Sequence, residues 1–558
     1  MARTIKIQCI NTGKELFLPN GISLKEIAEQ LEDELGFVPI AANVNNRMEC
    51  LSMELYHPKQ VEFVDVRSYQ GLHVYIPTLV FVVASAFEEL FPSGAFRLAH
   101  LSAGEMFCTF NTGTDNEDEP EKVVSAIVNR VTKICDADIP IEPIEEETAI
   151  VIEKFRKAGR KDIVQLLSNY HDLYATYYKM GQHIEYSYGP LAFSTRYVSQ
   201  FKLEACEGGM MLSAPLTLPS IYKEGENKIS QQELDVCCEV AEWNRRMHAS
   251  SVGEINANCM ERKGSGWLIK VAESLQERKI WQIAESIVSS GKRIVLIAGP
   301  SSSGKTTFSK RLEVALEAIG HMSFPISLDD FFVNRTETPR DENGEYDYEC
   351  IEALDVKLFN ECLSSLLSGK PVDLPTYNFV TGIKEYRKHN RKVVAPGYTF
   401  IVEGLHGLNP DLLTEIGPDQ VFRIYVSPMT SLALDDHVRV SATDNRLLRR
   451  ITRDAVQRNR TARVTLSSWQ KVREGEVKWI YPYRSNANVF FNTSLVYEIA
   501  VIKPFAEDLL REVPQNCPEY AEAKRLLIIL SYLVPLSDRE VPPTSIIREF
   551  VGGSSFRY

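Results

Sequence analysis

The chain has 558 residues, a net charge of −13 at pH 7, and ordinary fractions of hydrophobic (44%) and charged (25%) residues. These numbers are typical of a soluble protein of several domains, and they argue against a general nucleic-acid-binding protein, which needs a basic surface. Eleven Cys without a C-x-x-C pair, together with the lack of a signal-peptide pattern, predict a cytoplasmic protein with reduced thiols and no membrane segment.

Residues 1–66 are predicted to form a small β-grasp domain. The segment "TIKIQCI" alternates in polarity like a strand, and "SLKEIAEQLEDELG" has one apolar helical face. Ser23 is the expected N-cap of this helix and Gly36 its C-cap. Short strand-like segments follow, so the order of elements is strands, helix, strands.

Residues 67–235 are predicted to be a second domain of mixed α and β structure. The apolar run Pro77–Phe87 is too short to span a bilayer, so we expect a buried helix or strand there. Two helical segments follow, and then a strand hairpin around Gly208-Gly209. Residues 236–290 are predicted to be a helical connector.

From residue 291 strand, loop and helix alternate, which predicts a parallel sheet in residues 291–505 and a helical tail over 506–558. "RIVLIAGPSSSGKTTFSKRL" opens this region and contains the pattern G-x-x-x-x-G-K-[ST] between a strand and a helix. Such a loop binds phosphates through backbone N–H groups and a lysine, and its hydroxyl ligates Mg²⁺; the alternative is a chance Gly/Ser-rich loop. The residues expected to bind ATP are Gly299, Ser301, Ser302, Ser303, Gly304, Lys305, Thr306 and Thr307.

Two later strands end in acidic residues. Ligands of open α/β sheets lie beyond the carboxyl ends of the strands, so Asp329 and Asp330 are expected near the phosphate loop. A carboxylate there accepts a proton from an attacking hydroxyl or helps to hold Mg²⁺. Glu403, at the end of "YTFIVE", is predicted to assist the metal ion together with Thr306. The alternative for the Asp pair is an acidic turn or a helix cap.

The segment "RLLRRITRDAVQRNRTAR" is an unusual basic cluster in an acidic protein. Arg446, Arg449, Arg450 and Arg453 recur at helical spacing and therefore share roughly one face. We interpret the cluster as a lid that closes over the transferring phosphates and excludes water. The alternatives are a solvated surface helix and a contact with RNA.

Five motifs follow one another over the region from about 291 to 500. After the phosphate loop come "SLDDFF", which resembles S-x-D-x-F-Y, and "EYDYECIEALD", which resembles F-D-H-P-x-A-F-D. "PTYNFVTGIK" resembles P-x-Y-D-F-x-x-H-x-R, and "RRITRDAVQRNR" resembles R-R-x-x-R-D-x-x-x-R-G-R. In this order the motifs resemble those of the uridine–cytidine kinases, within the larger group that includes phosphoribulokinase.

This resemblance implies a P-loop kinase that uses ATP and Mg²⁺. It makes Asp329 the base on the nucleoside 5′-hydroxyl and Asp347 the residue that holds the ribose hydroxyls, with Arg450 nearby. The remaining implied residues are Tyr377, Phe379 and Arg460 for the base, and Lys305, Arg453 and Arg458 for the phosphates.

The sequence departs from the family pattern where the base is read. Gly382 stands at the position of the family's base-reading His, and Lys384 replaces its Arg. Tyr348-Glu349 replaces the His-Pro that follows the ribose-binding Asp. Pyrimidine specificity therefore stays open, and a purine nucleoside or another polyol is an alternative acceptor.

The front half also resembles a known protein. Residues 1–66 resemble the TGS domain of threonyl-tRNA synthetase, and 67–235 resemble that enzyme's second additional, editing-type domain. The H-x-x-x-H pair of the editing domain is missing, because no two of the ten His are four residues apart, so we expect no zinc or editing centre. The whole order resembles a class of bacterial fused nucleoside kinases.

Three hypotheses follow. The first is an ATP- and Mg²⁺-dependent nucleoside kinase, acting on uridine or cytidine, or on another small acceptor such as a purine nucleoside, sugar or polyol. The second is a nucleotide-gated regulator associated with RNA or the ribosome, against which the acidic net charge argues. The third keeps the kinase and makes the front half a regulatory or dimerising module, which leaves a homo-oligomer open.

Overall fold

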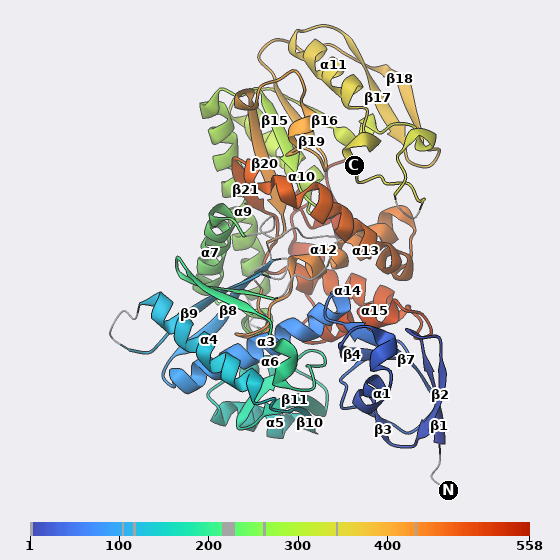
Figure 1. The fold of residues 1–558 in the computed structure, drawn as a ribbon. Coiled ribbons are helices and arrows are strands. Elements are labelled where there is room, and N and C mark those ends of the chain that lie inside the picture. Colours follow the sequence, from blue (N-terminus) through green and yellow to red (C-terminus); the bar gives the residue numbers. More distant parts are fainter. Residues whose placement is uncertain are drawn as a thin grey trace.

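The computed structural model describes residues 4–102, 105–114, 119–214, 229–260, 264–341, 344–429 and 432–557. Figure 1 shows the parallel sheet of the rear half at the top and the N-terminal strands at the lower right. Helices α12 (Ala442–Arg458) and α15 (Tyr520–Ser531) lie between them.

The N-terminal region is a five-stranded mixed sheet that shares a core with two short helices. Its elements are β1 Thr4–Cys9, β2 Glu15–Pro19, β3 Ile22–Ser23, α1 Leu24–Gln30, α2 Glu32–Leu35, β4 Pro39–Val44, β5 Met48–Glu49, β6 Glu54–Leu55 and β7 Lys59–Asp65. The strand order is β2-β1-β7-β4-β5. Ser23 caps α1 in a reciprocal capping box with Glu26, and Gly36 ends α2 in the left-handed conformation. The predicted caps Ser23 and Gly36 are confirmed, but the helix between them is divided at Leu31 into α1 and α2. The β-grasp and TGS assignments stay predictions.

The second region is built around the apolar helix α3. Its elements are α3 Tyr69–Leu90, β8 Ala95–Ser102, β9 Glu105–Asn111, α4 Pro120–Asp136, β10 Ile141–Glu147, α5 Thr148–Lys157, α6 Lys161–Leu167, β11 Tyr174–Met180, β12 His183–Tyr186, β13 Lys202–Cys206 and β14 Gly209–Ser213. The α3 helix packs with α4 and the sheet β13-β14-β9-β8 in one core, as its apolar sequence predicts. By length and composition α3 could cross a membrane, but 72% of its most apolar window is buried inside the protein, as in the core helix of a soluble protein. The synthetase-like assignment of this region stays a prediction.

One hydrophobic core joins the front and rear halves of the chain. It combines Phe155 of α5 and Tyr186 of β12 with apolar residues of α12, α14 (Glu498–Arg511) and α15. The hydroxyls of Tyr186 and Tyr532 share a hydrogen bond of 2.8 Å. The helices between the halves are α7 Gln231–Arg246, α8 Val252–Met260 and α9 Gly264–Ser290. The two halves therefore pack together, and the domain boundaries at 66, 235, 290 and 505 stay predictions.

The rear half contains the predicted parallel sheet. Its remaining elements are β15 Ile294–Ala298, α10 Lys305–Ala318, β16 Ser323–Ser327, α11 Val356–Leu367, β17 Val372–Asn378, β18 Ile383–Lys392, β19 Thr399–Glu403, β20 Val421–Ser427, α13 Ala462–Trp479, β21 Val489–Asn492 and α16 Arg548–Val551. Five strands run parallel in the order β16-β19-β15-β20-β21, which confirms the α/β fold. The carboxyl ends of β15, β16 and β19 meet at one edge, where a ligand of such a sheet binds.

Candidate phosphate-transfer site

The phosphate loop joins β15 to α10, as the sequence predicts. Gly304 is the N-cap of α10 with φ +86, and a Cβ on Gly299 would lie 1.9 Å from the carbonyl oxygen of Val426. Both positions therefore require glycine. Ser302 also adopts a left-handed conformation, with φ +59. A tight loop of this kind at the N-terminus of a long helix favours a bound anion.

Lys305 lies over the loop. Its Nζ donates hydrogen bonds to the carbonyl oxygens of Gly299 (2.8 Å) and Pro300 (3.1 Å). Burial lowers the pKa of the Lys305 ammonium, and the negative charges of Glu403 and Asp329 oppose that shift. The lysine is therefore surrounded by the same carboxylates that the sequence places at the strand ends.

The two neighbouring aspartates have different surroundings. Asp330 accepts a hydrogen bond from the backbone N–H of Tyr377 (3.3 Å), which ties β17 to the strand end. Asp329 stays open to solvent at the mouth of the site. Protein packed around Asp329 raises the pKa of its carboxyl, while the positive charges of Lys305 and Arg458 oppose this shift. Asp329 is therefore the aspartate that faces the phosphate loop.

Glu403 lies at the end of β19, between β16 and β15, with hydroxyl groups beside it. Thr306 Oγ1 and Ser327 Oγ each donate a hydrogen bond to Glu403 Oε1 at 3.4 Å. Burial raises the pKa of the Glu403 carboxyl to about 7, and the negative charge of Asp329 adds to the effect. Hydroxyl and carboxylate oxygens are the ligands that Mg²⁺ prefers, so this donor set fits the magnesium ion implied by the sequence.

Glu349 is a half-buried acid of the site to which the sequence motifs assign no role. Burial raises the pKa of its carboxyl to about 7; the positive charges of Arg450 and Lys305 oppose the shift, and the negative charges of Asp329 and Asp347 add to it. Asp347 Oδ1 accepts a hydrogen bond from the backbone N–H of Glu349 (3.0 Å). Glu349 therefore links the predicted ribose-binding Asp to the phosphate-binding residues. The only sequence signal is its place inside the ribose motif, where it replaces the family's Pro.

Arg446 and Arg449 of α12 support the phosphate loop from below. Both side chains are almost fully buried, with exposed fractions of 1% and 0%. Arg446 Nε donates to the carbonyl oxygen of Ser301 (2.8 Å), and Arg449 Nη1 donates to that of Ser303 (3.3 Å). Arg449 also pairs with Glu498 (2.6 Å). For these two residues the predicted lid is wrong, and so are the alternatives of a solvated helix or RNA contact, because α12 buries this face against the loop.

The other predicted arginines lie nearer the surface. Arg450 Nη1 donates to Ser301 Oγ (2.8 Å), so its contact is with the phosphate loop rather than with Asp347. Burial lowers the pKa of the Arg450 guanidinium to about 10. Arg458, at the end of α12, is 47% exposed, and Arg460 just beyond it is exposed. Arg458 also pairs with Asp454 (3.1 Å), one turn earlier in α12. Neither Arg458 nor Arg460 is part of a core, so a change in their position over a ligand would disrupt no core packing.

The C-terminal helix α16 forms another wall of this site, which no motif predicts. Glu549 accepts a hydrogen bond from Thr307 Oγ1 (2.7 Å) and pairs with Arg453 (3.4 Å). A Cβ on Gly304 would lie 2.6 Å from Ile546 Cγ2, so this segment also packs directly on the loop. The tail predicted for residues 506–558 is helical, but its last turns belong to the phosphate site.

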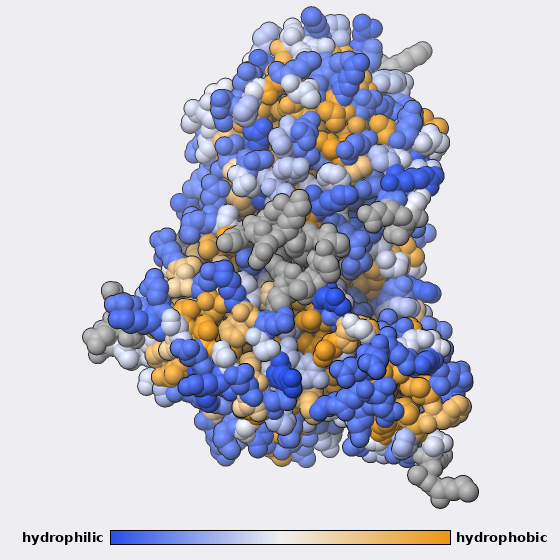
Figure 2. All heavy atoms as spheres, viewed as in Figure 1, coloured by the Kyte–Doolittle hydropathy of each residue, from blue (hydrophilic) through white to orange (hydrophobic). Residues whose placement is uncertain are grey.

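Aromatic rings line the acceptor side of the site. The ring centroids of Tyr377 and Phe379 are 5.1 Å apart, and Phe332 lies 5.5 Å from Tyr377. Tyr377 is 5% exposed, whereas Phe379 is 61% exposed. Figure 2 shows hydrophobic residues near the top of the molecule, where Figure 1 places α11, β17 and β18. The predicted base-pocket residues are therefore brought together, on the side of the site that is open to solvent.

Arg335 covers the position where the resembled family has its base-reading His. Gly382 has φ +70, and a Cβ there would lie 2.7 Å from Arg335 Nε. The Arg335 guanidinium donates hydrogen bonds to Tyr348 Oη (3.1 Å) and to the carbonyl oxygen of Phe379 (2.8 Å). The missing His is therefore replaced in space by an arginine from a different segment. The motif comparison missed this residue because Arg335 lies between two of the motifs.

Comparisons with known proteins agree with this geometry. The model of the phosphoribulokinase / uridine kinase family matches residues 294–500. A uridine kinase of Staphylococcus epidermidis is 30% identical over 201 residues, which are 35% of this chain and 85% of that protein. A uridine kinase of Halobacterium salinarum is 26% identical over 195 residues, which are 35% of this chain and 76% of that protein.

Two solved structures are also similar to part of this chain. A possible uridine kinase from Bacillus stearothermophilus has 19% identity and a TM-score of 0.24, covering 38% of this chain and 98% of that chain. The D-glycerate 3-kinase of Cryptococcus neoformans has 16% identity and a TM-score of 0.21, covering 45% of this chain and 87% of that chain.

A phosphate loop at the edge of a parallel sheet, with acids at the ends of the adjacent strands, defines a P-loop kinase, an enzyme that transfers phosphate from ATP. The chain belongs to the phosphoribulokinase / uridine kinase family, and residues 294–500 are its kinase region.

Proposed function

We propose that this kinase transfers the γ-phosphoryl group of ATP to the 5′-hydroxyl of a nucleoside, with uridine and cytidine as the first candidates. The observation that carries the proposal is the position of Asp329, which is open to an incoming hydroxyl and within the electrostatic influence of Lys305 and Arg458. The names of the related proteins, which are uridine kinases, support the choice of acceptor.

In the proposed reaction, Asp329 accepts the proton of the nucleoside 5′-hydroxyl, and the oxygen of that hydroxyl forms a bond to the γ-phosphorus. The bond from the γ-phosphorus to the bridging oxygen breaks, and ADP leaves with its electron pair. Lys305, Arg453 and Arg458 stabilise the charge on the transferring group. Thr306 and Glu403 would hold Mg²⁺, which when bound neutralises charge on the phosphate oxygens.

Acceptor binding is the part of the proposal with an open alternative. Asp347 would hold the ribose hydroxyls, since a carboxylate pairs well with two adjacent hydroxyls, and Tyr377 and Phe379 would stack on the base. Arg460, exposed beyond α12, would lie near the base. Arg335 at Gly382 offers donors only, whereas a neutral His offers a donor and an acceptor. A purine nucleoside, a sugar or another polyol is therefore the second candidate acceptor.

The regulator that binds RNA has less support than the kinase. Its sequence arguments are the synthetase-like front half and the basic helix as the RNA contact, but Arg446 and Arg449 of that helix are buried beneath the phosphate loop. The front half, in residues 1–235, would then serve the kinase as a regulatory or dimerising module. The proposal includes a cytoplasmic location and a homo-oligomeric state.

The test is ATP consumption by the purified chain with a panel of acceptors. The panel contains uridine, cytidine, purine nucleosides, ribulose 5-phosphate and simple polyols, with a no-acceptor control and a tRNA control. We expect turnover with uridine or cytidine and none with tRNA. Turnover with a different small acceptor would keep the mechanism and change the substrate. Turnover that ignores every small acceptor and rises with tRNA would overturn the proposal.

A further inference from the structure

A cavity of about 420 Å³ lies where the front half meets the rear half of the chain. It is well separated in sequence from the phosphate loop and shares none of the loop's residues. Its volume falls in the range of small-molecule binding sites. We name it the junction cavity. Its defining residues are Leu72, Ile76, Arg439, Asp444, Arg473 and Ile528.

The walls of the junction cavity differ in polarity. Leu72, Ile76 and Val80 of α3 face it from one side, and Ile528 and Ile529 of α15 line it from the other. The charged side chains of its lining are five cations, Arg47, Arg439, Arg473, Lys524 and Arg525, and three carboxylates, Glu49, Asp444 and Glu522. In a protein of net charge −13, this cavity therefore has a positive lining.

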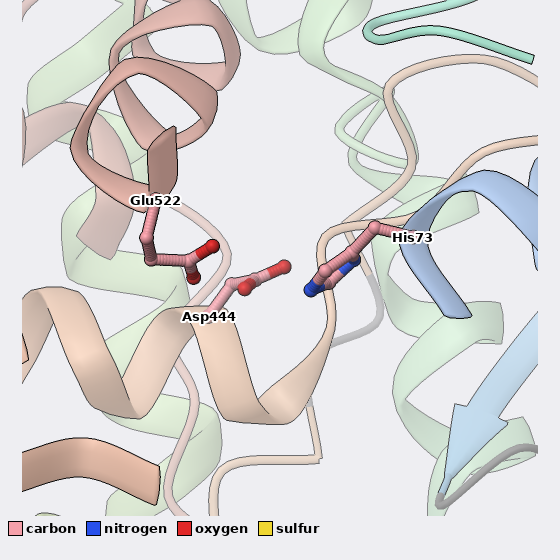
Figure 3. Close-up of side chains that lie close together, drawn as sticks. All are labelled: His73, Asp444 and Glu522. Carbon is pink, nitrogen blue, oxygen red and sulfur yellow. The ribbon is translucent and has the colours of Figure 1, made fainter. Parts of the chain in front are cut away.

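The carboxylates at one end of the cavity already have a cationic partner. Figure 3 shows His73 of α3, Asp444 of α12 and Glu522 of α15 pointing toward one another. Arg525 pairs with both Asp444 and Glu522. Burial lowers the pKa of His73 to about 4, so its ring is neutral at pH 7. The three residues have the spacing of a metal site, but a cation would have to displace Arg525.

Three polar atoms around the cavity lack a hydrogen-bond partner within the part of the chain that the structure describes. They are Tyr69 Oη, His73 Nε2 and Arg439 Nε, and all three are buried. Buried polar atoms in native proteins are nearly always satisfied, by protein, water or ligand. Arg439 is the informative one, because Nη1 donates to the Leu98 carbonyl oxygen (3.0 Å) and no ion pair with a carboxylate is found in the described residues. The negative charge of Asp436 acts on Arg439, but Asp436 forms its ion pair with Arg97 (3.1 Å). A half-buried guanidinium without an ion pair of its own favours an anion.

The junction cavity reaches the phosphate site through α12. Ser441 caps this helix at the cavity, and Asp444 lies in its first turn. In the second turn, Arg446 holds the carbonyl oxygen of Ser301 in the phosphate loop. A rigid helix that is anchored at both sites provides a physical link between them.

We propose that the junction cavity binds a small amphipathic anion and that this ligand regulates the kinase through α12. The carboxylate or phosphate group of the ligand pairs with Arg439, and its apolar part packs between α3 and α15. Such a molecule matches both the positive charge and the apolar walls of the cavity. The front half of the chain then has a task, because α3 supplies one of those walls.

The binding test is a calorimetric titration of the full chain with phenyl phosphate, with phenylacetate, and with benzyl alcohol as the neutral counterpart. A saturating non-hydrolysable ATP analogue keeps phenyl phosphate out of the phosphate loop. We expect the anions to bind with one-to-one stoichiometry, and the alcohol to bind at least about ten-fold more weakly. The two anions distinguish a phosphate ligand from a carboxylate. Equal affinity for the alcohol, or no binding of either anion, would overturn the proposal.

Two cavity variants and one surface control test whether the anions bind in the junction cavity. Arg439→Met keeps the aliphatic stem and removes the charge, so the anions should bind at least about ten-fold more weakly. Arg245→Met makes the same change on the exposed face of α7 and should leave the affinity unchanged. Leu72→Trp narrows the cavity while Arg439 stays, and should also weaken binding. Thermal melting of each variant shows that it is folded, and unchanged affinity in both folded cavity variants contradicts the site.

The regulatory part is tested by kinetics and by a metal titration. Phenyl phosphate or phenylacetate should change the KM for ATP at least about two-fold in the parent chain and not in Arg439→Met. If the anion binds tightly but the KM for ATP does not change, the proposed regulation through α12 is wrong. Stoichiometric Mn²⁺ binding that is lost in His73→Ala, without anion binding, would assign the cavity to a cation and overturn the proposal.

Discussion

The phosphate side and the acceptor side of this site are built differently. The phosphate loop rests on Arg446 and Arg449, which are almost fully buried and bonded to the loop carbonyl oxygens. On the acceptor side Tyr377 is buried, but Phe379 is 61% exposed and Arg335 is only partly buried. A fixed loop suits a ligand that is always the same, and an open wall suits one that differs between relatives.

This difference explains why the two sides carry unequal information about function. Phosphoryl transfer depends on charges held in fixed positions. Burying an ion pair costs desolvation free energy, and we expect that cost to be accepted where the geometry of the charges must be constant. Base recognition depends on a few hydrogen bonds at the surface. When one of these groups is lost, as where Gly382 stands in place of the family's His, a side chain from another segment can occupy its position. The following experiments separate the two sides, from the largest expected effect to the smallest.

The largest effect is expected from Asp329→Asn. The amide cannot accept the proton, so kcat should fall by about 10²–10⁴-fold while ATP binding stays within a few-fold of the parent. Single-turnover rates with uridine and titration with ATP measure the two quantities. Asp330→Asn is the matched control, because Asp330 holds the Tyr377 backbone and should lose less activity. Inactive Asp330→Asn with active Asp329→Asn would reverse the assignment.

A second large effect is expected on stability, from Arg449→Met. Removing the guanidinium leaves Glu498 buried without its partner, which should lower the free energy of unfolding by about 3–5 kcal/mol. Arg463→Met, at an exposed pair with Glu519, should lower it by less than about 1 kcal/mol. Denaturant unfolding of both variants measures the difference. Equal losses would show that the buried arginines do not fix the phosphate loop.

The sequence predicted the phosphate side well because its signals are local. Gly299, Gly304 and Lys305 lie in one short motif, and the parallel strands bring Asp329 and Glu403 to the same edge. The remaining features need contacts between distant segments. Glu549 reaches Thr307 across 242 positions of sequence, and no periodicity predicts that.

The spacing of the arginines correctly predicted a helix but not which of its side chains would be buried. The spacing places them on α12, but it does not tell which way the helix faces. Burial of two of them depends on α14, whose Glu498 supplies the counter-charge. The shared core of front and rear halves was equally hidden, because tertiary packing between Phe155 and the C-terminal helices leaves no local pattern.

On the acceptor side, Arg335→Ala should change the choice of nucleoside. The variant loses the donors that cover Gly382, so kcat/KM for the acceptor should fall by about 10–10²-fold while the KM for ATP stays constant. Kinetics with uridine, cytidine and a purine nucleoside give the comparison. Arg340→Ala is a control with an exposed arginine from the same loop region. A rise in the KM for ATP would mean that the two sides are not separate.

A smaller effect is expected from pH. Protein packed around Asp329 raises the pKa of its carboxyl above the ordinary value of 3.8, and the general base works only when it is ionised. Activity should therefore be full at higher pH and fall on acidification, beginning above the usual aspartate range. The profile of kcat/KM for the acceptor, from about pH 3.5 to about pH 9, measures this limb. An acidic limb centred at or below the ordinary aspartate pKa would contradict a raised pKa.

The smallest effect is expected from Glu549→Gln, which tests whether the C-terminal helix α16 contributes to the phosphate side. The glutamine still accepts the hydrogen bond from Thr307 but no longer attracts Arg453, which then pairs more readily with ATP phosphates. The pair is mostly buried but long, so we expect the KM for ATP to fall by only about two- to five-fold, with kcat unchanged. Glu242→Gln on α7 is the control, because its ion pairs are on the surface. A higher KM for ATP in Glu549→Gln would instead show that this carboxylate holds Arg453 in the position that ATP requires, so that α16 belongs to the fixed phosphate side.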